Sequence, residues 1–271
     1  MTSTESQYRV ASLAKGLSVL AVCAAEGRDL RIVDIAGMTG LPTPTVFRLL
    51  RTLESEGYLE QVESGRFRPG PAALGLGYQL TRSHGLVVVA NEPLRRLATE
   101  TGATVNLAVL TGVNVLYLIR IRGDALITAN IEVGAQIPAA CTSLGKALLA
   151  NLEPPDLKKR LRSVRLDVCQ GPRAISSMEQ FEADLTETRA RGWAIQEEEF
   201  AQGLSSLAAP VFDDNGILAA VNAVTQTTDR ESLIGRMLEP LLDVARDLSR
   251  RYGHVEPAGA HIKQDGLLKP V

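Results

Sequence analysis

The 271-residue sequence has few cysteines, few aromatic residues and no long apolar run. Its three cysteines, Cys23, Cys141 and Cys169, are odd in number, far apart and outside any CxxC motif. This pattern argues against a disulfide framework and against a zinc site. No apolar segment approaches the ~18 residues of a membrane span, and the first residues lack the basic and apolar stretches of a signal peptide. We therefore expect a soluble, cytoplasmic protein with no membrane partner.

Histidine is also scarce, with only His84, His254 and His261 in the chain. The sequence has no GxSxG motif, no HExxH motif and no phosphate-binding glycine loop. An enzyme with Cys141 as its nucleophile would need a base beside that thiol. None of the three histidines is well placed for this role, since one lies in an expected linker and two lie near the C-terminus. The sequence disfavours an enzyme and predicts neither a cofactor nor a bound metal.

The charges are nearly balanced, with 29 basic and 31 acidic residues and a formal net charge of −2. This balance gives no overall attraction to nucleic acid, so a DNA-binding protein would need its basic residues arranged locally. At roughly 100–200 residues per domain, the length favours two domains.

The first 70 residues predict three short helices and a β-hairpin. Apolar residues recur at helical spacing from Val10 to Ala25, and a second short helix begins at Ile32 and ends at Thr39-Gly40. A third helix covers residues 41–53, with Thr43 as its cap, Pro44 at its first position and a buried stripe formed by Val46, Leu49, Leu50 and Leu53. Two alternating runs around Glu63-Ser64-Gly65 predict the hairpin. This order is typical of a winged helix-turn-helix, which we assign to residues 8–70.

The third helix is the expected recognition helix, because the second helix of a helix-turn-helix pair enters the major groove. Arg48 can bond a guanine edge, while hydroxyls and a second arginine suit phosphates. Two arginines on one face of the hairpin suit a wing along the DNA backbone. The candidate DNA-binding residues are Thr43, Thr45, Phe47, Arg48, Arg51, Arg66 and Arg68. The alternative is a solvated surface, because exposed arginines are common on helices.

The rest of the chain mixes strand-like runs with amphipathic helices. Residues 71–92 predict a linker helix, residues 93–252 a second domain, and residues 253–271 a flexible tail. Strands are expected over residues 104–110, 113–121, 125–131, 193–197, 205–212 and 217–225. Helices are expected from Leu144, from Pro154, after the Ser177 cap, and over the periodic segment from Leu233 to Leu248. The expected fold class is α+β, with an antiparallel sheet of about six strands flanked by helices.

Several motifs occur together in order and at family-like spacing. They are residues 12–17 (SLAKGL), Gly40-Leu41-Pro42 with Arg48-Leu49-Leu50, Gly57-Tyr58-Leu59, residues 142–150 (TSLGKALLA) and residues 203–211 (GLSSLAAPV). With these motifs the sequence resembles the IclR family of bacterial transcriptional regulators over residues 8–252. Residues 137–143 and 218–222 resemble its PcaR/PcaU/PobR branch, which governs catabolism of protocatechuate and 4-hydroxybenzoate.

The resemblance implies a winged helix-turn-helix that binds double-stranded operator DNA, a linker helix, and a GAF-like domain that binds a small carboxylic acid. It also implies a homodimer or a dimer of dimers. Effector contacts carried over by motif match, together with the hydroxyls before the helix at Leu144, give a candidate set. This set is Ile137, Cys141, Thr142, Ser143, Leu144, Gln196, Glu197, Ser206 and Asn222.

Simpler roles compete at these positions. Thr142 and Ser143 suit a helix cap, and Cys141 suits a small buried apolar residue. The run Glu197-Glu198-Glu199 suits a partly solvated strand end, and Lys146 suits an exposed position. A regulator of a different small-acid pathway, or a DNA-binding protein whose second domain only oligomerises, is the alternative function.

Overall fold

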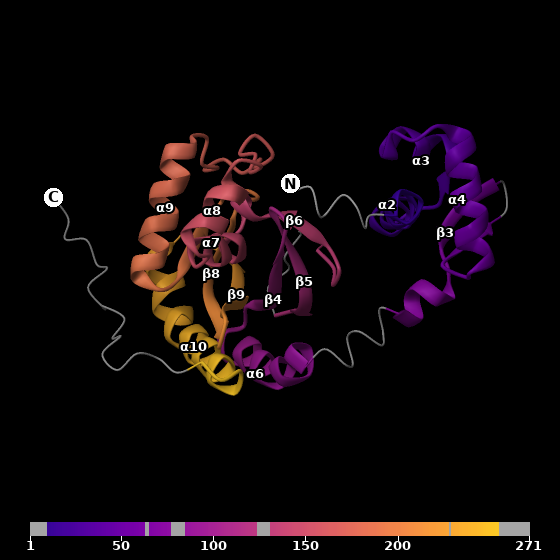
Figure 1. The fold of residues 1–271 in the computed structure, drawn as a ribbon. Coiled ribbons are helices and arrows are strands. Elements are labelled where there is room, and N and C mark those ends of the chain that lie inside the picture. Colours follow the sequence, from indigo (N-terminus) through magenta and orange to yellow (C-terminus); the bar gives the residue numbers. More distant parts are fainter. Residues whose placement is uncertain (1–9, 63–64, 77–84, 124–130, 228, 255–271) are drawn as a thin grey trace. The chain divides into compact units, whose positions relative to one another are not determined.

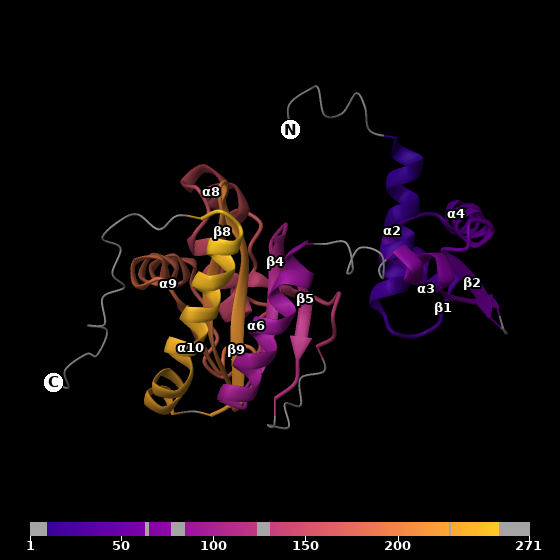
Figure 2. The same ribbon diagram turned by 90° about the horizontal axis from the view of Figure 1, so that it is seen from below.

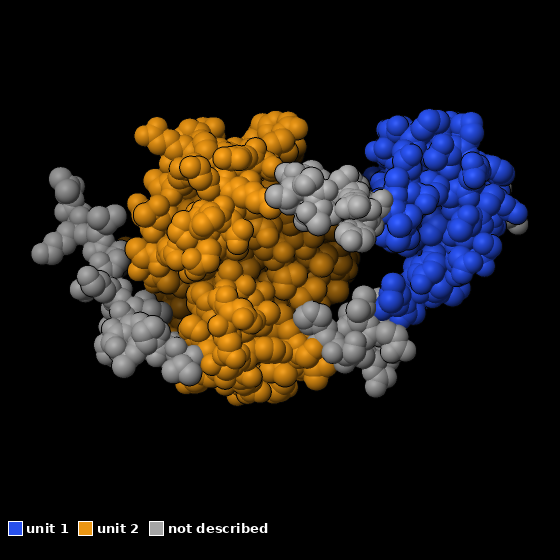
Figure 3. Space-filling view, in the orientation of Figure 1, with its two compact units in different colours: residues 1–84 blue, residues 85–271 orange. Residues whose placement is uncertain are grey.

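The computed structural model describes residues 10–62, 65–76, 85–123, 131–227 and 229–254. The chain forms two compact units, residues 1–84 and residues 85–271 (Figure 3). Each unit encloses apolar clusters of its own. In the described part of the chain, no helix is long and apolar enough to cross a membrane.

The described part of the first unit contains the helices α2 (Ala11–Ala25), α3 (Ile32–Thr39) and α4 (Thr43–Ser55), a small antiparallel sheet, and a helical segment at residues 71–76 (Figure 1). The sheet has the order β1 (Leu30–Arg31), β3 (Arg66–Pro69), β2 (Leu59–Val62). The three helices and the hairpin were predicted correctly. Strand β1 was missed, because two residues are too few to show alternation.

Two details of this unit differ from the prediction. Val10, Leu13 and Leu17 are 56–60% exposed, and α2 buries Val19 and Cys23 instead. Since α2 carries apolar residues around most of its circumference, their spacing does not identify the buried face. The cap residue of α4 is Pro42, without a side-chain cap bond. Thr43 is already helical, so its hydroxyl does not cap the helix and the following proline takes the second helical position.

The second unit is built on a six-stranded antiparallel sheet in the order β6-β5-β4-β9-β8-β7. Its strands are β4 (Thr104–Thr111), β5 (Asn114–Ile121), β6 (Gln136–Pro138), β7 (Ala194–Glu197), β8 (Leu204–Asp213) and β9 (Gly216–Gln226). The six-stranded α+β fold was predicted correctly. The strand expected over residues 125–131 lies outside the described residues except for Ile131. The structure has instead a strand that was not expected, β6, next to β5 at one edge of the sheet.

Helices cover both faces of this sheet (Figure 2). One face packs against α6 (Gly85–Thr101) and α10 (Arg230–Arg251). The other face packs against the short helix η2 (Ala139–Cys141), α7 (Ser143–Ala150) and α9 (Met178–Arg191), with α8 (Pro154–Leu161) beside them. Strand alternation divides the side chains: Val105 and Leu107 enter the first layer, and Ala108 enters the second.

The linker helix expected over residues 71–92 is described in two parts. Residues 71–76 are helical, and α6 begins at Gly85. Residues 77–84 lie outside the described residues, as do residues 255–271 of the expected tail.

Candidate functional site

The exposed face of α4 carries most of the predicted DNA-binding residues. Thr43, Phe47 and Arg48 are exposed, while Thr45 is half-buried. Arg51 forms an ion pair with Glu54 on the same helix, Nη1 to Oε2 at 2.7 Å, whereas Arg48 has no ion pair with any described residue. Arg48 is therefore the arginine of α4 that can turn to a base edge without first breaking an ion pair.

The hairpin presents its two predicted arginines on one side. Arg66 and Arg68 are both exposed, and the residue between them is buried. Arg68 Nε contacts Glu60 Oε1 at 2.5 Å on the paired strand, and Arg66 Nη1 donates to the backbone oxygen of Asp29 at 3.4 Å. The hairpin thus presents both guanidinium groups on one side of the strand, where they are accessible to solvent.

A small cavity lies in the second unit, between the sheet and the N-terminus of α7. Strands β4, β5, β7, β8 and β9 contribute to its wall, together with η2 and the loop between β7 and β8. The lining residues are Asn106, Tyr117, Arg120, Ile131, Cys141, Thr142, Gln196, Phe200, Leu204, Ser206, Asn222 and Val224. Its volume is about 30 Å³, whereas a single buried water needs about 10–15 Å³. In this structure the cavity therefore has room for water, and an aromatic ring would need a wider one.

Polar side chains on the cavity face of the sheet form a continuous chain of hydrogen bonds. Arg120 Nη1 donates to Asn106 Oδ1 at 3.5 Å, and Asn106 Nδ2 donates to Asn222 Oδ1 at 2.8 Å. Asn222 Nδ2 lies 3.5 Å from Ser143 Oγ, which in turn lies 2.7 Å from Ser206 Oγ. Asn106, Asn222, Ser143 and Ser206 are all buried. Such a network favours one rotamer for each of its side chains, because a rotamer that breaks a hydrogen bond would leave a buried polar group unpaired at a cost in free energy.

Gln196 connects this chain to the loop between β7 and β8. In the amide orientation that satisfies all its neighbours, its nitrogen donates to Ser206 Oγ at 3.2 Å. Its oxygen accepts from the backbone N–H groups of Glu199 and Phe200 at 2.7 and 3.0 Å, and of Glu198 at 3.2 Å. A side chain from the sheet therefore holds the loop that carries one wall of the cavity.

Two ionisable groups in the cavity wall are affected by burial. Burial raises the pKa of Tyr117 to about 12, so its phenol stays neutral and can donate a hydrogen bond. Burial also lowers the pKa of Arg120. The guanidinium of Arg120 brings a positive charge and hydrogen-bond donors to the wall of the cavity.

The structure brings five of the nine predicted effector residues to the cavity, namely Cys141, Thr142, Gln196, Ser206 and Asn222. Ser143 joins the polar network behind the wall. Ile137 and Leu144 pack in the apolar cluster beneath α7. Glu197 forms ion pairs with Arg230 and Arg173, at 2.5 and 4.0 Å. Of the two hydroxyls expected to cap α7, only Thr142 does so, by accepting from Gly145 N at 3.0 Å.

Sequence reasoning missed Asn106, Tyr117, Arg120 and Phe200. Asn106 lies opposite Arg120 across β4 and β5, and opposite Asn222 across β4 and β9. The signal that was available is a polar residue at an alternating position of an otherwise apolar strand. It was not used, because alternation alone does not show which polar residues face each other.

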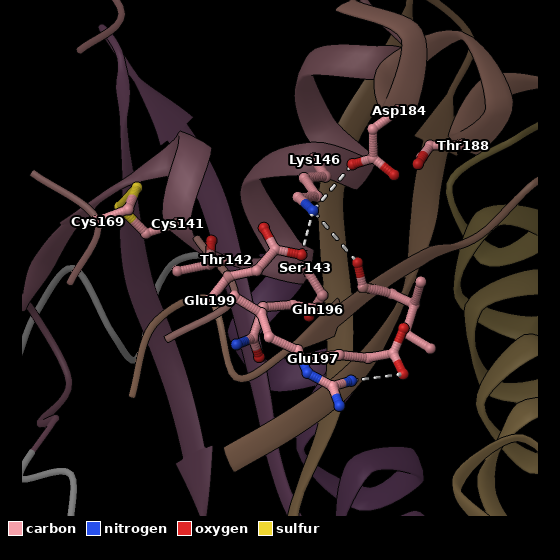
Figure 4. A network of polar contacts seen from close by, with 12 residues as sticks. Cys141, Thr142, Ser143, Lys146, Cys169, Asp184, Thr188, Gln196, Glu197 and Glu199 are labelled. Atoms are coloured by element: carbon pink, nitrogen blue, oxygen red, sulfur yellow. Dashed lines mark hydrogen bonds and ion pairs between the residues drawn. A yellow bond between two sulfur atoms is a disulfide. The ribbon is translucent and has the colours of Figure 1, made fainter. Parts of the chain in front are cut away.

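Lys146 and Glu199 contradict the prediction of exposed charges. Lys146 is 1% exposed and points between two carboxylates of other elements (Figure 4). Its Nζ lies 2.9 Å from Asp184 Oδ2 on α9 and 2.6 Å from Glu199 Oε1. Glu199 is itself 8% exposed, although its run of glutamates suggested solvent. Both predictions failed because the partners are far apart in the sequence: Lys146 and Glu199 are separated by 53 positions.

The expectation of unpaired cysteines was also wrong. Cys141 and Cys169 form a disulfide (Figure 4), and only Cys23 is free. The two residues are 28 positions apart, and the segment after α8 folds back over η2. Spacing in the sequence could not show this return, because the two helices between the cysteines, α7 and α8, can pack in more than one direction.

A winged helix-turn-helix unit followed by an α+β unit with an internal polar cavity defines a DNA-binding regulator with a second, separate domain. The IclR helix-turn-helix domain model matches residues 12–63, and the model of the bacterial transcriptional regulator IclR C-terminal domain matches residues 78–250. The chain belongs to the IclR family of bacterial transcriptional regulators, as its motifs indicated. Members of this family regulate transcription, which agrees with the sequence-based preference against an enzyme.

Individual relatives support the same assignment. The chain is 34% identical over 242 residues to the Pca regulon regulatory protein of Pseudomonas putida, covering 88% of this chain and 82% of that protein. The crystal structure of an IclR family transcriptional regulator from Brucella abortus is 27% identical, with a TM-score of 0.77 and coverage of 91% and 94%. An IclR homologue from Microbacterium hydrocarbonoxydans, complexed with 4-hydroxybenzoate, shares the fold at 22% identity, with a TM-score of 0.71 and coverage of 89% and 100%.

Proposed function

We propose that this transcriptional regulator binds a small carboxylic acid, of the aromatic type, in the cavity beside α7, and that binding changes its affinity for operator DNA. The observation that carries the proposal is the set of hydrogen-bond donors in the wall: the guanidinium of Arg120, which is half-buried, the amides of Asn106 and Asn222, and the hydroxyls of Tyr117 and Thr142. A carboxylate is an acceptor that a guanidinium binds through charge-assisted hydrogen bonds.

The remaining wall suits the rest of an aromatic acid. Tyr117 and Phe200 offer aromatic faces, and the buried amide of Asn222 offers a polar contact. Ligand sites are commonly apolar clefts with a few fixed polar groups that set orientation. The 4-hydroxybenzoate complex of the Microbacterium homologue and the Pca regulon relative support an aromatic acid.

The DNA-binding step is proposed to use the exposed face of α4 and the hairpin. Arg48 would contact a base edge, and Thr43, Thr45, Phe47, Arg51, Arg66 and Arg68 would contact phosphates or a thymine methyl. Effector binding would then shift the population between conformations with high and low operator affinity. Association as a homodimer or a dimer of dimers stays a prediction from the family resemblance.

The effector is tested by thermal unfolding of the full-length protein with protocatechuate and with 4-hydroxybenzoate. A ligand at ~100 times its Kd adds about 2.7 kcal/mol to the free energy of unfolding. Arg120→Gln should weaken binding roughly 10- to 100-fold, since a hydrogen bond to a charged group contributes about 1.5–3 kcal/mol. Arg122→Gln is the matched control, because Arg122 is exposed and forms its ion pair with Glu132 outside the cavity.

The regulatory step is tested by fluorescence anisotropy of DNA from the region upstream of the protein's own gene, at two salt concentrations. The proposal expects tight, salt-sensitive binding that one of the acids changes. Operator binding that no acid changes, together with no thermal stabilisation, would instead support a DNA-binding protein whose second unit senses nothing.

A further inference from the structure

The disulfide in the second unit lies in the wall of the cavity. Cys141 is 2% exposed and lines the cavity directly, next to Thr142, which caps α7. Cys169 is half-buried and lies outside the cavity, in the segment that follows α8. The sulfur that a solvent thiol reaches more easily is therefore that of Cys169, and the sulfur next to a ligand is that of Cys141.

The segment that carries Cys169 is also hydrogen-bonded to the loop between β7 and β8, which forms a second wall of the cavity. Two residues after the disulfide, Gly171 N donates to the backbone oxygen of Glu199 at 3.0 Å, and Arg173 N donates to that of Glu198 at 3.3 Å. A Cβ atom on Gly171 would overlap these backbone atoms, so the two segments are in close contact. Glu198 and Glu199 belong to the loop that carries Phe200 into the cavity. The disulfide thus joins the η2 wall to the loop wall through a single short segment.

The cavity between these joined walls is small. It measures about 30 Å³, whereas an engineered cavity of about 150 Å³ binds benzene. An aromatic acid can enter only if a wall moves outward. The disulfide ties two of the cavity's walls to each other.

We propose that the Cys141–Cys169 pair is a thiol–disulfide exchange site that controls admission of the effector, with the reduced form as the form that binds an aromatic acid well. This inference rests on the proposed function of the cavity. A dithiol reductant would attack Cys169 Sγ and form a mixed disulfide, and Cys141 would leave as a thiolate and take up a proton. The second thiol of the reductant then displaces Cys169. The net change is one dithiol oxidised to its disulfide and the protein disulfide reduced to two thiols.

The test measures the affinity for 4-hydroxybenzoate and protocatechuate by calorimetry, with full-length protein oxidised by glutathione disulfide or reduced by dithiothreitol. Thiol alkylation and mass measurement confirm each state. If about one molecule in ten has a widened cavity while the disulfide is intact, reduction of the disulfide should lower the Kd by about tenfold. Cys169→Ser should bind like the reduced protein under both conditions, since Cys169 does not line the cavity.

Cys23→Ser is the matched control. Cys23 is buried in the first unit, and burial raises the pKa of its thiol to about 11, which keeps it protonated and unreactive. This variant should respond to oxidation and reduction as the wild type does. An equal Kd in both states, tighter binding in the oxidised state, or failure of the disulfide to form would each overturn the inference.

A second readout separates this inference from the proposed function. If neither acid binds in either state, the proposed effector class is wrong, and amide hydrogen exchange then decides the redox coupling. Reduction of the disulfide should lower the protection of backbone amides against hydrogen exchange at residues 196–203 and at the start of α7. Unchanged protection at both places would refute a coupling between the disulfide and the cavity walls.

Discussion

Replacing Lys146 by methionine tests whether buried charge holds the second unit together. Lys146 Nζ is 2.9 Å from Asp184 Oδ2 and 2.6 Å from Glu199 Oε1, and it is 1% exposed. Methionine fills a similar volume but leaves Glu199, which is buried, and Asp184, which is partly buried, without their cation. Breaking a buried ion pair by removing one partner costs about 3–5 kcal/mol. We expect Lys146→Met to lower the free energy of unfolding by this amount at pH 8.

The loss should depend on pH, and the sign follows from Glu199. Burial raises the pKa of Glu199 above its ordinary value, and Lys146 opposes this rise. Removal of the lysine therefore raises the pKa further. A carboxyl whose pKa is higher in the folded state stabilises the fold when protonated, and this contribution disappears as the pH rises through the folded pKa. The destabilisation by Lys146→Met should accordingly be smaller at pH 5 than at pH 8.

Urea denaturation at both pH values measures these differences through the shift in midpoint. Lys158→Met is the matched control, because Lys158 is exposed on α8 and its loss should change stability by less than about 0.5 kcal/mol. Adding Glu199→Gln to Lys146→Met should recover part of the loss at pH 8. A loss below about 1 kcal/mol at pH 8, or a loss that grows toward pH 5, would contradict the argument.

Three further predictions concern the other contacts. Arg48→Ala should weaken operator binding by about tenfold or more and relax the base preference at one position, as anisotropy with single-base operator variants would show. An operator affinity within twofold of the wild type would exclude Arg48 from base readout. Gly145→Ala should destabilise the protein by about 2–3 kcal/mol, because the added Cβ would overlap the backbone of Ala139. Its control, Gly235→Ala, meets open space on α10 and should stabilise by roughly 0.5–1 kcal/mol; similar thermal midpoints for the two would refute the packing argument. The double variant Cys141→Ser/Cys169→Ser should lose roughly 3–4 kcal/mol in denaturant under oxidising conditions, from the 28-residue separation of the disulfide, and the loss should vanish with reductant present.

The fold could be predicted largely from local patterns. Helix α10 has apolar residues at helical spacing along most of its length, and the strands β8 and β9 are joined by the turn residues Asp214 and Asn215. These signals depend only on neighbours within a few positions. The face of α2 could not be predicted in the same way, because Leu13 and Val19 are equally apolar and only packing against the rest of the unit selects the second.

The candidate site could be predicted only in part. Gln196, Ser206 and Asn222 were found through family motifs and Thr142 through its place just before a helix, whereas Arg120 carried no motif. Pairing across the sheet brings Arg120 opposite Asn106, and this register depends on the bulge at Leu107 and Ala108. Ion pairs and disulfides between distant segments are equally invisible before the topology is known, which is why Lys146 and the disulfide-bonded pair were misjudged.

The loop between β7 and β8 connects these separate features. Its backbone N–H groups are bound by Gln196, its Glu199 side chain by Lys146, and its carbonyl groups by the segment that carries Cys169. A buried ion pair is seldom the most stable filling for a core, since apolar residues of similar volume often stabilise as much or more. What the ion pair provides is a defined position for the loop. Because Phe200 extends from this loop into the cavity wall, a loop held by three independent contacts can set the cavity's shape, and the release of one contact can change it.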